Sequence, residues 1–229
     1  MALGAAKKSN SSTPSESLTN KAYKHLEELI VTLRLAPGAV LSETMLAEQL
    51  QIGRTPIREA LQRLSRESLV TIIPRKAILV TDINPRKQLL LLEVRREIER
   101  LMARSGARRS TAEERAELFE IAEGMDKAAE EDDGIAFMRH DNRLNILVAE
   151  ACHNEYASRA VGLMHGLSRR FWYVHFKEAA DLPLCARLHA KLARGIAEGD
   201  EDRAAKASDA LLDYVEDFTR ATVDMGGRR

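Results

Sequence analysis

Residues 36–80 carry two short helical patterns followed by two β-branched runs, an order that few folds accommodate. The first helix is expected over residues 43–50, and residues 51–53 supply a turn before the second helix. The apolar side chains of the first helix should face inward, namely Met45, Leu46 and Leu50. The pattern predicts a helix-turn-helix, in which the second helix is held at the surface.

The second helix has an apolar stripe on one side and a basic, polar row on the other. The apolar residues recur at three- and four-residue spacing, as Ile57, Ala60, Leu61 and Leu64. The helix is expected to begin near Thr55, whose hydroxyl would cap the first amides, with Pro56 in the first turn. The outward-facing candidates for DNA contact are Arg54, Thr55, Arg58 and Gln62. Free amides and guanidinium groups together suit a phosphate and a guanine edge.

The two β-branched runs cover residues 69–73 and 77–80, and Pro74 precedes two basic residues between them. A hairpin of this kind places Arg75 and Lys76 at its tip, beside a phosphate backbone or in the minor groove. Arginines opposite an apolar stripe are most often a solvated helix face. The ordered set of helix, turn, basic helix and basic hairpin nevertheless predicts a winged helix-turn-helix that binds double-stranded DNA.

Length and charge fit two domains. The 229 residues have no formal net charge, but residues 1–82 hold 11 basic and 8 acidic side chains. Cys152 and Cys185 are the only cysteines, so we expect no disulfide framework and a cytoplasmic location. No apolar run approaches the roughly 18 residues that span a membrane. The expected organisation is a flexible arm over 1–17, the DNA-binding domain over 18–82 and a second domain over 83–229.

The second domain shows helical periodicity almost throughout. Apolar positions at helical spacing mark six segments, near residues 89–102, 118–125, 144–151, 157–174, 182–197 and 203–222. Short polar breaks such as Gly199-Asp200 separate them. The chain is therefore expected to be mainly α, with an N-terminal winged helix-turn-helix and a C-terminal antiparallel six-helix bundle.

The N-terminal motifs resemble those of the GntR transcriptional regulators. The matching pieces are Pro37-Gly38, Leu41-Ser42, Leu46-Ala47-Glu48-Gln49-Leu50 and Arg54-Thr55-Pro56-Ile57-Arg58-Glu59-Ala60-Leu61. The resemblance implies that Arg54, Thr55 and Arg58 contact DNA, with the two arginines as base readers. Two departures are Gly53, where serine is common, and Ala77, where the wing usually has a glycine that tolerates positive φ.

The helical half resembles the FCD domain of the FadR-type subgroup of these regulators. The matching pieces are residues 92–99, Asp141, residues 149–154 and His189. The resemblance implies a homodimeric transcription factor, usually a repressor, whose operator affinity responds to a small molecule bound in the helical domain.

Many domains of this kind hold a divalent metal through four side chains, and here the family positions read Asp141, Asn145, His189 and Leu211. Leucine cannot ligate, and a single imidazole should bind zinc far more weakly than three would. Two readings stay open at these positions: a weak divalent-metal site, zinc being an example, and a polar pocket that binds the effector directly.

Two arginines are candidates for holding a carboxylate-bearing effector, aliphatic or aromatic. Arg95 is at a family position that faces the cavity, and Arg170 belongs to a cluster of cations and aromatics at residues 169–173. With them we place Asp141, Asn145 and His189. A metal-assisted enzyme would need a full ligand set and a general base, so no enzyme is expected. An effector-independent DNA-binding protein with a vestigial pocket remains the alternative.

Overall fold

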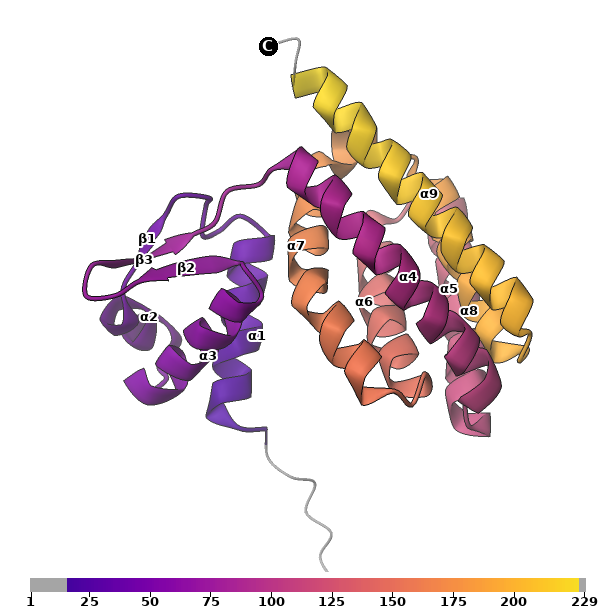
Figure 1. Cartoon of the computed structure of the whole chain (residues 1–229), viewed down its shortest axis with the longest axis horizontal. Coiled ribbons are helices and arrows are strands. Elements are labelled where there is room, and N and C mark those ends of the chain that lie inside the picture. The colour runs from indigo at the N-terminus through magenta and orange to yellow at the C-terminus, as the bar shows by residue number, and fades with distance from the viewer. Residues whose placement is uncertain (1–15, 227–229) are drawn as a thin grey trace, which may run out of the picture.

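The computed structural model describes residues 16–226, apart from the side chains of residues 177–179 and 224–226. It shows an N-terminal domain with a small sheet beside a C-terminal domain of helices (Figure 1). The predicted arm over residues 1–17 lies outside the described residues except for its last two. Of these, Ser17 caps the first helix by accepting a hydrogen bond from the Asn20 amide.

The N-terminal domain is a winged helix-turn-helix, as the sequence predicts. Its elements are α1 (Leu18–Val31), β1 (Val40–Leu41), α2 (Glu43–Leu50), α3 (Arg54–Arg66), β2 (Val70–Ile73) and β3 (Ala77–Val80). The three strands are antiparallel in the order β1-β3-β2, with Ile72 opposite Ile78. The β2–β3 hairpin is the wing, and it projects away from the helical domain (Figure 1).

The apolar stripe of α3 forms the centre of this domain. Ile57, Ala60, Leu61 and Leu64 are all buried. They join α1 residues such as Leu26 and Ile30 in one core, where a fully buried apolar side chain contributes about 1.5–3 kcal/mol. The predicted inward face of α3 is therefore confirmed, and its opposite face is left to solvent.

Two local predictions in this domain are wrong. The helix α3 begins at Arg54, and its N-cap is Gly53, which makes no side-chain capping bond. Thr55 is thus already inside the first turn, where its hydroxyl does not cap the helix. In α2, Leu46 is buried but Met45 is 43% exposed, because successive residues differ by about 100° around a helix and only one of the two can face α3.

The C-terminal domain contains the six predicted helices. They are α4 (Pro85–Arg109), α5 (Ala112–Glu131), α6 (Gly134–Ala151), α7 (Glu155–Ala179), α8 (Leu182–Ala197) and α9 (Glu201–Gly226). Helix α8 packs against both α5 and α9, and α4 runs alongside α9 (Figure 1). Their apolar faces form one core, which confirms the bundle.

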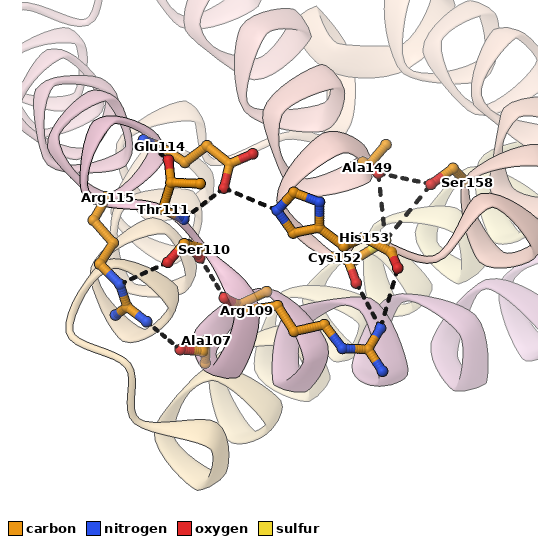
Figure 2. A network of polar contacts seen from close by, with 11 residues as sticks. Ala107, Arg109, Ser110, Thr111, Glu114, Arg115, Ala149, Cys152, His153 and Ser158 are labelled. Carbon is orange, nitrogen blue, oxygen red and sulfur yellow. Dashed lines mark hydrogen bonds and ion pairs between the residues drawn. The ribbon is translucent and has the colours of Figure 1, made fainter.

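Polar contacts fasten the α4–α5 turn to the α6–α7 turn at one end of the bundle (Figure 2). The Arg109 guanidinium donates to the carbonyls of Cys152, at 2.9 Å, and His153. The His153 ring nitrogen lies 3.2 Å from the carboxylate of Glu114. The 149–154 motif is therefore part of a structural turn, and none of its residues lines the cavity described below.

Helix α7 is the part of the bundle that lies against the N-terminal domain. Leu167 packs on the core of that domain. The neighbouring Gly166 permits the close approach, since a Cβ there would lie 2.7 Å from a methyl carbon of Leu69. No helix in the described part of the chain is both long and apolar enough to cross a membrane.

Candidate functional site

The outer face of α3 presents the residues that were predicted to contact DNA. Thr55 and Gln62 are exposed, and the side chains of Arg54 and Arg58 are 64% and 55% exposed. The structure thus brings these four residues together on one helical surface. Exposed guanidinium, hydroxyl and amide side chains at the N-terminal part of a helix suit the edges and phosphates of a duplex.

Glu43, at the start of α2, holds the two arginines of α3. Its carboxylate accepts two hydrogen bonds from Arg58, at 2.8 Å from Nε and 2.7 Å from Nη2, and lies 3.8 Å from Nη2 of Arg54. The hydrogen bonds with Glu43 raise the pKa of Arg58, and those with Arg58 lower the pKa of Glu43. Sequence reasoning missed Glu43. The only signal for it in the sequence is an acidic residue fifteen positions before Arg58.

The wing carries its two basic residues at the tip, as predicted. Arg75 and Lys76 are exposed, and the Lys76 amide donates to the carbonyl of Ile73 to close the turn. The left-handed residue of this turn is Arg75, with φ of 58°, whereas Ala77 is already in β3. Ala77 therefore does not have to adopt a positive φ, because the turn places that conformation on Arg75.

A cavity of about 100 Å³ lies inside the bundle, between α4, α6, α7, α8 and α9. Its polar wall includes Arg95, Glu99, Asp141, Asn145, Arg169 and His189. Its apolar wall includes Phe137, Leu144, Trp172, Leu211 and Phe218. The cavity is small beside the roughly 300–1,000 Å³ of pockets for drug-sized ligands, so it suits a molecule of few atoms with both a charged and an apolar part.

Asp141, Asn145 and His189 come together at this cavity. Nε2 of His189 lies 3.1 Å from Oδ1 of Asp141, which also accepts a hydrogen bond from Nδ2 of Asn145 at 3.1 Å. The other ring nitrogen, Nδ1, donates to the carbonyl of Cys185 at 2.8 Å. Both ring nitrogens face acceptors, so the imidazole carries two protons and forms an ion pair with Asp141.

The pKa values of the pair agree with this geometry. Burial alone would lower the pKa of His189, but Cys185 and Asp141 raise it well above its usual value. Burial alone would raise the pKa of Asp141, but its contacts with His189 lower it. The two charges therefore compensate each other in a site that has little solvent.

The donor set does not fit a zinc ion held in the way the resemblance implies. Among the described residues, no three His, Cys, Asp or Glu side chains lie close enough to bind a metal. Asn145 turns its amide nitrogen, not its oxygen, toward Asp141. Leu211 contributes only carbon at the fourth position. One carboxylate and one imidazole are left, fewer than the three protein ligands typical of even an open zinc site.

The two predicted effector arginines have different positions. Arg95 lines the cavity, where its Nε lies 2.5 Å from Oε1 of Glu99. Arg170 does not line it, because its guanidinium donates to the Thr81 carbonyl at 2.8 Å, the Thr81 hydroxyl and the Asp82 carbonyl. The placement of Arg170 in the effector site is therefore wrong. Its neighbour Arg169 faces the cavity instead, and nothing in the sequence distinguishes the two.

These features define a DNA-binding transcriptional regulator with a separate helical domain, and the comparisons with known proteins agree. Residues 18–80 match the family described as bacterial regulatory proteins, gntR family. Residues 90–214 match the FCD domain. The chain therefore belongs to the GntR family, with an FCD domain that fits the FadR-type subgroup.

Individual relatives support the same assignment. An uncharacterized HTH-type transcriptional regulator of Streptomyces ambofaciens is 43% identical over 63 residues, which are 28% of this chain and 27% of that protein. The Escherichia coli regulator McbR is 32% identical over 117 residues, 51% of this chain and 53% of McbR. The chain thus spans about half of the length of McbR and about a quarter of the length of the Streptomyces protein.

Longer matches are more distant. The Escherichia coli transcriptional repressor RspR is 22% identical over 207 residues, covering 90% of this chain and 91% of RspR. The solved structure of E. coli McbR/YncC has a TM-score of 0.75 at 21% identity, over 91% of this chain and 99% of that one. At this identity the likeness establishes the fold, and it extends across both domains.

Proposed function

We propose that this chain represses transcription and that a small carboxylate-bearing metabolite, bound in the bundle cavity, controls its affinity for an operator. The observation that carries the proposal is the cavity itself, because its walls include α4 and α7. Helix α4 follows the DNA-binding domain directly, and α7 packs against α1 of that domain. A ligand held between these helices is therefore well placed to bias the orientation of the domain that reads DNA. The name of RspR, a transcriptional repressor, supports the sign of regulation.

The chemistry of the cavity favours an acid with an apolar part. Arg95 of α4 and Arg169 of α7 are the two arginines of its lining, and Phe137, Trp172 and Phe218 are among its aromatic residues. The indole N–H of Trp172, which is one of two buried side-chain polar atoms left without a partner in the described residues, adds a donor beside the cavity. Asp141, Asn145 and His189 complete the polar wall as groups that would orient the ligand.

A second copy of the chain is the proposed protein partner. An exposed apolar stripe runs along α4, where Leu90, Val94 and Leu101 are 63%, 52% and 49% exposed. Their spacing puts them within about 40° of one another around the helix axis. A second copy that covers this stripe would bring two α3 helices to one duplex, as a palindromic operator requires.

The test combines ligand binding with DNA release. A thermal-shift screen of small organic acids should find one that raises the melting temperature, is not consumed, and weakens binding to a duplex that the protein has selected from a random pool. Arg95→Ala should keep DNA binding but blunt the response to that acid. An acid that binds without any effect on DNA affinity would instead favour an effector-independent regulator with a vestigial pocket.

A further inference from the structure

Arg169 belongs both to the cavity wall and to the boundary between the domains. Its side chain lines the cavity, and its Nη1 lies 3.1 Å from Oε1 of Glu27 on α1. The two side chains are only 28% and 15% exposed, so solvent screens the pair weakly. Among the described residues, this is the only ion pair that joins the two domains. One guanidinium therefore faces the ligand site and the DNA-binding domain together.

The contacts around Arg169 hold it in this position. Gly166, one turn earlier on α7, lies close to the same carboxylate, since a Cβ there would be in ordinary van der Waals contact with Oε1 of Glu27, at 3.5 Å. Arg170, the next residue, fixes the chain between β3 and α4 through the carbonyls of Thr81 and Asp82. Because Arg169 and Arg170 are on the same helix, movement of α1 away from α7 would separate Arg169 from Glu27.

Besides Arg169, Glu27 lies near a second carboxylate, that of Glu67. Burial first, and then the carboxylates of Glu27 and Glu67, raise the pKa of Tyr23. Burial also raises the pKa of Glu67, with a smaller contribution from Glu27. Without the guanidinium, Glu27 would be a poorly solvated anion beside another carboxylate. The contact of α1 with α7 would then be weakened.

We propose that Arg169 is a ligand-binding residue that exchanges Glu27 for the carboxylate of an acidic ligand in the cavity. The inference rests on the proposed function, and it adds the residue through which the ligand acts. The ligand and Glu27 compete for one guanidinium, so ligand binding weakens the contact between α1 and α7. The coupling is reciprocal, so that contact lowers the affinity for the ligand by the same factor. Arg95 cannot play this part, since its partner Glu99 is on its own helix.

The experiment compares Glu27→Gln with Glu28→Gln, an exposed neighbour on the same helix, and with Arg169→Gln. Benzoate and succinate are titrated separately into each full-length protein by calorimetry. Removing the competing charge should tighten the dissociation constant of the bound acid about three- to tenfold in Glu27→Gln. Glu28→Gln should match the wild type, and Arg169→Gln should lose about tenfold or more.

Hydrogen exchange without ligand gives a second readout. Amides of residues 22–31 should exchange at least about threefold faster in Glu27→Gln than in Glu28→Gln, because the contact that holds α1 is lost. Equal acid affinities in these two variants, or equal exchange rates, would overturn this inference but leave the proposed function standing. Tighter binding by the wild type than by Glu27→Gln would also overturn it. No binding of either acid to any variant would overturn the proposed function, and the inference with it.

Discussion

Glu43 sets how the positive charge of α3 is presented. Its carboxylate is shared between Arg58 and Arg54, so the predicted base readers do not point freely into solvent. A bidentate contact holds a guanidinium in one plane, which reduces the entropy lost when it meets a guanine edge. The same carboxylate repels phosphates. If Arg58 and Arg54 contact DNA as proposed, we expect Glu43 to favour specificity at the expense of total affinity.

Glu43→Gln should reverse that balance. The change adds one unit of positive charge to the interface, so affinity for a scrambled duplex should rise about three- to tenfold at low salt. The ratio of specific to non-specific affinity should fall, because Arg58 loses its bidentate partner. Fluorescence anisotropy over a salt series measures both quantities. An unchanged ratio would show that Glu43 does not orient Arg58, and Glu48→Gln, exposed farther along α2, serves as the control.

The Asp141–His189 pair gives a pH dependence of stability. The pKa of His189 is raised in the folded state, so its contribution is full below the unfolded value near 6.5 and is lost as the pH rises through the folded value. The pKa of Asp141 is lowered, so its contribution is present above the unfolded value near 3.8 and is lost as the pH falls through the folded value. The pair should therefore stabilise the fold most between these two reference values.

Asp141→Asn should then cost about 3 kcal/mol of unfolding free energy at pH 6, and the cost should fall as the pH rises through the raised pKa of His189. Urea unfolding over a series of pH values upward from 6 measures the change. Asp217→Asn, on an exposed part of α9, should change little across the series. A cost for Asp141→Asn that does not vary with pH would contradict the ion pair.

At the scale of elements, periodicity predicted the helices because each buries one apolar face. The stripe of α3 and the six helices of the bundle follow directly from residue spacing. The strand β1, only Val40–Leu41, was not predicted, because two residues have no period of their own and pair only with β3. Met45 was misplaced because its neighbour Leu46 takes the inward face of this short helix.

The crossing of α8 and α9 provides a prediction at this scale. A Cβ on Gly195 would lie 3.0 Å from the backbone Cα and N of Ala204, and a backbone cannot yield as a side-chain tip can. Gly195→Ala should lower the unfolding free energy by about 1–3 kcal/mol, through overpacking. Gly162→Ala, where a Cβ would meet nothing within 4 Å, should raise it by about 0.5–1 kcal/mol. Chemical denaturation of both variants decides this, and stabilisation by Gly195→Ala would contradict the close crossing.

At the scale of the whole molecule, the sequence predicted the helices and the wing of each domain but not how the domains meet. Arg169 and Arg170 are adjacent and chemically identical, yet one faces the cavity and Glu27 while the other holds the linker at Thr81. Their directions depend on how α7 docks against the DNA-binding domain. That docking is set by contacts between residues far apart in sequence, such as Gly166 with Leu69, and no local pattern records it.

The central claim is that the exposed face of α3 reads duplex DNA, and Arg58→Ala tests it most directly. Anisotropy at near-physiological salt should be measured on the duplex selected by the wild type and on a scrambled duplex. The account predicts a loss of about 10- to 100-fold on the selected duplex and less than about threefold on the scrambled one. Arg187→Ala, an exposed arginine on α8, should change neither. Wild-type affinity of Arg58→Ala for the selected duplex would contradict the account.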